Sequence, residues 1–122
     1  MFAYCQAIGE TNPAYPQSAS DADGKIAPPT FAAVYALGAG SGSLAAVGVA
    51  PSRLIHGEQE FEWSRAIRVG ERLTTTGRIS EVEQKRSLTF VTAESTVVDE
   101  AGEVVCVSRA TILVLPEAGS KA

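Results

Sequence analysis

Two residues near the N-terminus, Glu10 and Tyr15, have side chains that can take part in proton chemistry and lie in one short, proline-containing segment. A carboxylate can act as a general acid or base. A tyrosine phenol has a reference pKa of about 10, so Tyr15 is a poor base at neutral pH, although it can hold a water molecule. The alternative is that Glu10 is a solvated loop carboxylate and that Tyr15 packs against a helix. The residues alone leave both interpretations open.

A second group of candidate residues follows two prolines at positions 28 and 29. Proline lacks a backbone N–H, so Thr30 and Phe31 are the first residues there that can donate one. Prolines are tolerated in the first helical turn, where free N–H groups can bind a negatively charged oxygen. The Thr30 hydroxyl can add a further contact. The equal alternative is that water caps these donors.

His56 is the only histidine in the chain. In a strand with regular alternation it shares a face with Glu58, Glu60 and Glu62, whereas Ile55, Gly57, Gln59, Phe61 and Trp63 occupy the other face. No second histidine or cysteine lies nearby, so we expect no metal site. A solvated face or a subunit interface is the preferred interpretation.

The composition describes an acidic chain of globular type. It has 122 residues and a formal net charge of -4, which argues against nucleic acid as the main partner. The two cysteines, Cys5 and Cys106, are far apart and are interpreted as reduced, buried thiols of a cytoplasmic protein. The first ten residues lack the basic start of a signal peptide.

Two helices are predicted in the first half of the chain. Residues 2–8 form a short helix that Gly9 stops. Residues 9–30 form a loop, and a second, entirely apolar helix begins near Pro28 or Pro29, runs through Leu37 and ends in the Gly/Ser cluster at 38–43. Residues 26–52 contain no charge and could span a bilayer by length. Their prolines, glycines and serines favour a helix buried within protein instead, so no membrane association is expected.

The second half of the chain predicts a β-sheet. Strands are expected at 53–64, 71–83, 87–98 and 103–115, with Leu73, Thr75, Gly77 and Ile79 sharing one face of the second strand. Turns are expected at 83–87 and 99–102, where Gly102 suits a positive φ. Consecutive hairpins give an antiparallel sheet, and the compact arrangement is an α+β domain over 1–116 in which the sheet wraps around the apolar helix. Residues 117–122 are a predicted disordered tail. Edge pairing between two subunits would cover the open edge of such a sheet.

Three segments together resemble the MaoC-like, or hydratase-2, hot-dog family, in its N-terminal MaoC-like dehydratase domain type. Gly9-x-x-Asn12-Pro13 with Tyr15 is similar to the Gly-Asp-x-Asn-Pro-x-His motif, Ala27-Pro28-Pro29-Thr30-Phe31 looks like the start of the central helix, and HGEQEF at 56–61 looks like the next strand. The group includes non-hydrating partner subunits of mycobacterial (3R)-hydroxyacyl-ACP dehydratases.

The resemblance implies a hot-dog fold, acyl chains on coenzyme A or acyl carrier protein as substrates, no other cofactor, and reversible addition of water to a 2-enoyl thioester. It assigns Glu10 and Tyr15 to the catalytic Asp and His positions and Asn12, Thr30 and Phe31 to substrate binding. Both catalytic positions depart from the motif. Some cations may be used against phosphates or a carrier protein, although ordinary solubility is favoured for them: Arg53, Arg65, Arg68, Lys85 and Arg86.

Three functions are therefore open. The leading hypothesis is a subunit of an (R)-specific hydratase or dehydratase, paired with a catalytic MaoC-like chain. The second is a self-sufficient homodimeric hydratase that uses Glu10 and Tyr15. The third is a non-enzymatic module that binds acyl thioesters. Family members usually carry one more strand-forming segment before the first helix, which this sequence lacks.

Overall fold

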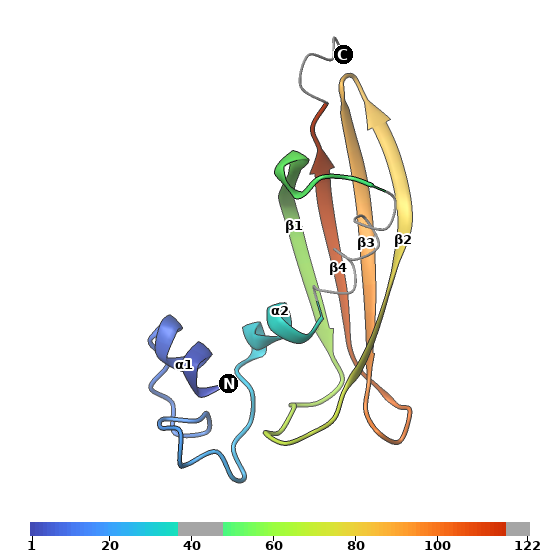
Figure 1. The fold of residues 1–122 in the computed structure, drawn as a ribbon. Coiled ribbons are helices and arrows are strands. Elements are labelled where there is room, and N and C mark those ends of the chain that lie inside the picture. The colour runs from blue at the N-terminus through green and yellow to red at the C-terminus, as the bar shows by residue number, and fades with distance from the viewer. Residues whose placement is uncertain (37–47, 117–122) are drawn as a thin grey trace.

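A computed structural model describes residues 1–36 and 48–116 of the chain (Figure 1). Two short helices come first and a four-stranded antiparallel sheet follows, with α1 and α2 beside one end of the sheet. The elements in chain order are α1 (Phe2–Ile8), η1 (Pro29–Phe31), α2 (Ala32–Tyr35), η2 (Pro51–Arg53), β1 (Leu54–Trp63), β2 (Thr74–Lys85), β3 (Leu88–Val98) and β4 (Val104–Val114).

The helix boundaries follow the local signals in the sequence. Gly9 ends α1 in the left-handed conformation with φ 72°, and its N–H donates back to the Gln6 carbonyl. The second helix begins at Pro29 as a 3-10 turn and continues as α2, which confirms the predicted start. Leu37, the Gly/Ser cluster at 38–43 and the predicted tail at 117–122 lie outside the described residues.

The strand order is β1-β4-β3-β2, so the prediction that all four strands are joined by hairpins is wrong for the first connection. β1 pairs with β4 at one edge, and the chain then crosses to the opposite edge before β2 begins. The crossover, residues 64–73, is ten residues long and contacts the N-terminal loop through a bridge between Ile26 and Arg68. Hairpin turns need two to five residues, so a connection of this length does not impose pairing between its strands.

A β-bulge in β1 also overturns the predicted position of His56. The register moves from His56 opposite Ile112 to Glu58 opposite Thr111, which leaves Gly57 without a partner. The extra residue reverses the alternation. His56 therefore shares the inner face, which carries the buried residues of β4, with Gln59, Phe61 and Trp63, whereas Glu58, Glu60 and Glu62 lie on the outer face.

The hairpin between β2 and β3 is tighter than predicted. Lys85 pairs with Leu88, so only Arg86 and Ser87 form the turn, and Arg86 has a φ of 56°. Residues 81–86 are all exposed, and their polar composition reflects this rather than a longer turn. The turn after β3 is as predicted, with Gly102 at φ 82°. The predicted face of Leu73, Thr75, Gly77 and Ile79 is also confirmed in register.

The helix meets the sheet through small side chains. Ala32 and Ala36 are completely buried and belong to a cluster with Val97, Val105 and Cys106 of the inner sheet face. Alanine at a contact allows the helix backbone to approach the sheet closely. The opposite face of α2 is not covered by the described residues, because Ala33 is exposed and Val34 keeps 58% of its surface exposed. The expectation that protein surrounds the helix is thus met on one side only.

The second cluster on the inner face lies farther along the sheet. Val91, Ala110, Ile112 and Val114 form it, with Leu54 and Ile79 packed at its margin. In residues 1–36 and 48–116, no helix has both the length and the apolar character needed to cross a bilayer.

Enlarging Ala32 should destabilise the fold far more than enlarging its neighbour Ala33. Ala32→Leu inserts three carbon atoms into a contact with no free space, and overpacking of this kind costs about 1–3 kcal/mol. Ala33→Leu, on the exposed side of the same helix, should change stability by less than about 0.5 kcal/mol. Urea unfolding of both variants measures the difference, and equal midpoints would contradict the packing.

Candidate functional site

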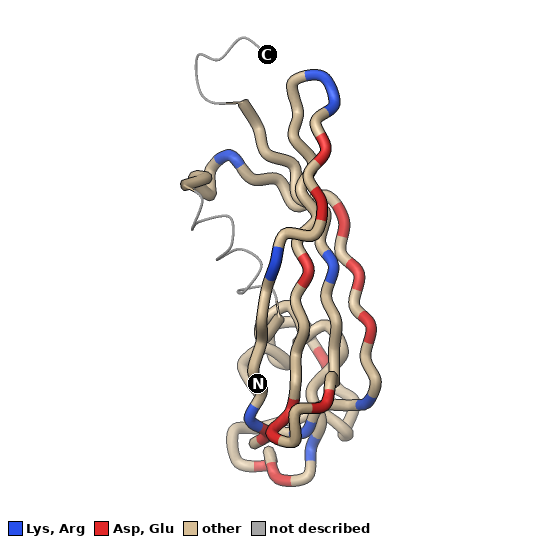
Figure 2. The backbone as a smooth tube through the Cα atoms, turned by 90° about the vertical axis from the view of Figure 1, so that its right-hand side faces the viewer, with Lys and Arg blue, Asp and Glu red and all other residues tan. Residues whose placement is uncertain are grey.

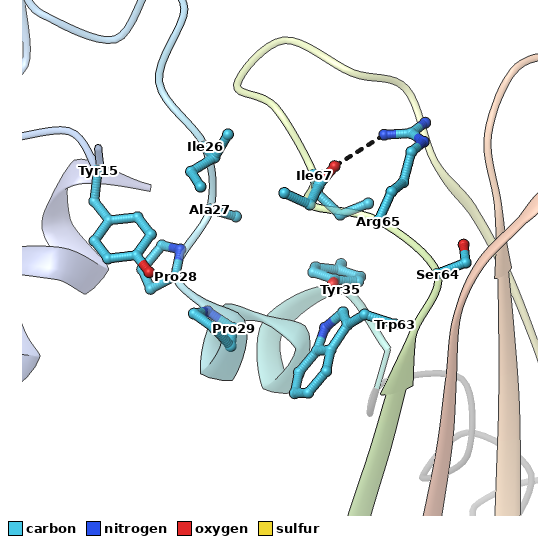
Figure 3. Close-up of a pocket in the computed structure, with 11 residues that line it drawn as sticks. Tyr15, Ile26, Ala27, Pro28, Pro29, Tyr35, Trp63, Ser64, Arg65 and Ile67 are labelled. Atoms are coloured by element: carbon cyan, nitrogen blue, oxygen red, sulfur yellow. Dashed lines mark hydrogen bonds between the residues drawn. The ribbon is translucent and has the colours of Figure 1, made fainter.

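A cavity of about 300 Å³ lies where the N-terminal loop, the start of the helix and the end of β1 meet (Figure 3). Its wall is mainly apolar and contains three aromatic rings. The lining residues are Tyr15, Ile26, Ala27, Pro28, Pro29, Tyr35, Trp63, Ser64, Arg65, Ala66 and Ile67. The cavity is thus built from three segments that are far apart in sequence.

Backbone hydrogen bonds join the loop to the crossover behind this cavity. The Ala27 N–H donates to the Ile67 carbonyl at 2.7 Å, and the Val69 N–H donates to the Lys25 carbonyl at 2.9 Å. Ala27 and Ile67 are both buried. These contacts fix the Tyr15 loop against the end of the sheet and so fix the width of the cavity.

Tyr35 and Trp63 form the wall on the sheet side. Burial raises the pKa of the Tyr35 hydroxyl to about 12, with a further increase from Cys106, whereas the Trp63 side chain lowers it. Tyr35 therefore stays protonated at neutral pH and is available as a hydrogen-bond donor rather than as a base. Burial likewise raises the pKa of the Cys106 thiol. Cys5 and Cys106 are both free and buried, as predicted.

Tyr15 is the only one of the five predicted site residues that lines the cavity. Its ring is half-buried beside Pro28, and Figure 3 shows the hydroxyl directed toward that proline. The position fits both interpretations of the sequence, because the side chain packs against the helix start and also presents a hydroxyl to the cavity.

Glu10 and Asn12 serve the local turn instead. The Glu10 carboxylate accepts the Asn12 N–H at 2.9 Å, and the Asn12 side-chain oxygen accepts the Ala14 N–H at 2.9 Å. Neither residue lines the cavity. The structure therefore does not bring the Glu10 carboxylate together with Tyr15 at the cavity wall.

Thr30 and Phe31 lie at the helix start, next to the cavity. The Phe31 N–H donates to the Pro28 carbonyl at 2.9 Å, so it is already used within the 3-10 turn. The Thr30 N–H donates to no residue within 1–36 or 48–116, and the Thr30 hydroxyl accepts a hydrogen bond from Tyr4 at 2.9 Å. Tyr4 also contacts the Phe31 ring edge to face, with 5.1 Å between centroids. Of the two predicted donors, Thr30 has the available amide.

Arg65 lines the cavity, but its charge is neutralised from behind. Its guanidinium donates to both carboxylate oxygens of Glu71, at 2.9 and 2.6 Å, and to Asp99 at 3.1 Å. It also donates to the Ala66 carbonyl, the contact drawn in Figure 3. Arg65 therefore ties the crossover to the turn between β3 and β4, and the cavity carries little net positive charge.

The other predicted cations are spread over the molecule. Arg53 donates to the Leu115 carbonyl, and Lys85 is 3.6 Å from Glu83. Arg68 lies in the crossover, and Arg86 forms the β2–β3 turn at the end of the sheet away from the cavity. Across the described ranges, no group of three or more His, Cys, Asp or Glu side chains is placed to hold a metal ion.

Two cavity residues, Tyr35 and Trp63, were not among the candidates from sequence. Trp63 was placed on the correct strand face, together with Phe61, and the two rings lie 5.5 Å apart. The available signal was the aromatic pair at the end of a strand whose other face is acidic.

The family model described as "FAS1-like, dehydratase domain region" matches residues 2–108 of this chain. A UPF0336 protein from Streptomyces griseus is 37% identical over 109 residues, a region that covers 84% of this chain and 72% of the relative. The match extends from α1 almost to the end of the sheet.

Solved structures share the same fold. The HadBC (3R-hydroxyacyl-ACP dehydratase) complex from Mycobacterium tuberculosis superposes with a TM-score of 0.75 and 20% identity, covering 91% of this chain and 82% of that one. The R-hydratase PhaJ1 from Pseudomonas aeruginosa gives a TM-score of 0.66 and 21% identity, covering 94% and 72%. These likenesses confirm the predicted α+β hot-dog fold.

Removing Arg65 should make the stability less dependent on acidic pH. Arg65 lowers the pKa of Glu71, and the Glu103 N–H followed by Arg65 lowers that of Asp99. A carboxyl with a lowered folded-state pKa stabilises the protein above its unfolded pKa of about 4, and this is lost as the pH falls through the folded value. Arg65→Met should flatten the fall in unfolding free energy below about pH 5.

Arg72→Met is the matched control for that measurement. Arg72 lies 3.8 Å from Glu100, and both side chains are highly exposed. Its removal should leave the pH profile from denaturant titrations unchanged. Identical profiles for the Arg65 variant and the unmodified chain would show that the ion pairs contribute nothing to acid stability.

Proposed function

This chain belongs to the FAS1-like dehydratase domain region family, a MaoC-like hot-dog family, and on that premise we propose that it is a subunit of an (R)-specific enoyl-thioester hydratase or 3-hydroxyacyl-thioester dehydratase. Its role is to bind the acyl thioester and to pair with a catalytic MaoC-like chain that supplies the acid and base. The substrate is carried on coenzyme A or on acyl carrier protein.

The observation that carries the proposal is the composition of the cavity. Its walls are aromatic rings, prolines and aliphatic side chains, and its one cation is held by two carboxylates. Such a site favours a neutral, apolar ligand over a charged one, because apolar burial drives binding there. An acyl chain fits this requirement, and phosphate groups of a carrier would remain outside.

The same cavity lacks an acid–base pair of its own. Glu10 is engaged in the loop turn, and Tyr35 stays protonated. His56 lies seven residues before Trp63 on β1, roughly 20 Å away at 3.3 Å per strand residue. Water addition needs a base for the water and an acid for C2, so these groups are assigned to the partner chain.

Thr30 is the proposed contact for the thioester carbonyl. Its amide is the first donor after two prolines, and its hydroxyl is held by Tyr4. A backbone N–H in this place can stabilise the negative charge that develops on the carbonyl oxygen when water adds to the double bond. The likeness to a solved dehydratase complex supports pairing with a second chain.

Mixing this chain with a MaoC-like partner that has an intact Gly-Asp-x-Asn-Pro-x-His motif should produce crotonyl-CoA hydration well above that of either chain alone. Replacing the partner's histidine should then lower the rate by about 100-fold or more, the usual contribution of a positioned acid or base. Tyr15→Phe in this chain should leave most of the rate. Loss of the enoyl absorbance measures hydration.

Two other outcomes would replace the proposal. Hydration by this chain alone, abolished by Glu10→Ala, would identify a self-sufficient enzyme. Binding of acyl-CoA without turnover in the presence of any catalytic partner would identify a binding module.

Ligand binding at the cavity should change the fluorescence of Trp63, the only tryptophan in the chain. Octanoyl-CoA should shift the emission, and free coenzyme A should not. Ala66→Leu extends a side chain at the cavity wall and should weaken the octanoyl-CoA response by roughly tenfold, as expected for overpacking of about 1–3 kcal/mol.

Ala19→Leu, in an exposed part of the N-terminal loop, is the control and should bind as the unmodified chain does. An equal response to coenzyme A and octanoyl-CoA would exclude the cavity as an acyl site.

A further inference from the structure

β1 forms an open edge of the sheet. It pairs with β4 on one side, and no described strand pairs with its other side over the ten residues Leu54–Trp63. Unpaired backbone groups along an edge strand can accept another strand. Ile55 and Trp63 keep 47% and 39% of their surface exposed, so this edge is not shielded by its own large side chains.

The outer face of this edge is strongly acidic. Glu58, Glu60 and Glu62 occupy alternate positions, and the strand contains no lysine or arginine (Figure 2). Arg109 of β4 lies 3.0 Å from Glu60 and 3.5 Å from Glu62, but it also pairs with Glu94 at 3.2 Å. One shared cation therefore faces three carboxylates along the edge.

The alternation decides which strand this edge can accept. Directly opposite residues of an antiparallel pair point to the same face, so outer positions face outer positions. In a two-fold pair of identical chains, a centre at Glu58, Glu60 or Glu62 sets that residue against its own copy. A centre at Gln59 sets Glu58 against Glu60, and a centre at Phe61 sets Glu60 against Glu62. Every such register therefore places like charges opposite one another, which destabilises the pair.

We infer that the β1 edge docks an antiparallel strand of a different chain, one with lysine or arginine at alternate outer positions, and that it disfavours a second copy of this chain. The inner side of such a strand must be apolar, because it meets Phe61 and Trp63. The inference rests on the proposed function only in that the bound chain would be the catalytic partner, since the charge argument needs no activity.

A charge-exchanged version of this chain provides a partner with a basic edge. E58K/E60K/E62K carries the lysines, and R109Q is added so that they do not face a cation. Glu94 then keeps Arg78 at 3.1 Å. At low salt, an equimolar mixture with the unmodified chain should sediment as a one-to-one complex, and amide hydrogen exchange within residues 54–63 should slow on mixing.

A neutral version, E58Q/E60Q/E62Q, tests the disfavoured pairing. It should self-associate at least about tenfold more tightly than the unmodified chain, because the opposed charges are gone. E81K/E83K reverses two exposed glutamates on the outer face of β2, at the opposite edge, and should form no complex with the unmodified chain.

Three results would overturn the inference: self-association of the unmodified chain as tight as that of the neutral version, no complex with the basic version when both chains are folded, or a complex that leaves exchange at 54–63 unchanged. None of these measurements depends on turnover, so failure of the hydration assay leaves the edge assignment intact, and the reverse also holds.

Discussion

Ala32 and Ala36 bring the backbone of the second helix directly against the inner face of the sheet, and the positions of the other elements follow from this contact. A larger side chain at either position would lift the helix away. Because the helix is close, Tyr35 reaches Cys106 and Trp63, and the two prolines before the helix form one wall of the cavity. The packing of the core and the shape of the site are therefore one constraint.

The cavity divides the residue types by task. Aromatic and aliphatic side chains shape it, and the polar groups around it are mostly engaged with each other: Glu10 with a turn amide and Arg65 with two carboxylates. This arrangement suits holding a ligand more than transforming it. It also explains why a chain with the sheet and helix of a dehydratase family can retain the fold although its motif departs from the catalytic pattern at two positions.

Local signals predicted local structure correctly. Gly9, Pro29 and Gly102 each act through their own backbone conformation, and each ends, begins or turns an element where expected. The errors concern contacts that no short segment encodes. The pairing of β1 with β4 depends on residues more than forty positions apart, and one bulge at Gly57 moved His56 to the other face. Tyr15 was found through a motif, whereas Tyr35 and Trp63 meet only after folding.

The pairing of β1 with β4 also sets an order on folding. β2, β3 and β4 are joined by short turns and can pair as each is synthesised, but β1 is made before all of them and joins the sheet only through the last strand. Contacts between distant segments form slowly, because a long loop must close first. During synthesis, Phe61 and Trp63 therefore wait without a sheet, and the nascent chain is open to wrong association in this interval.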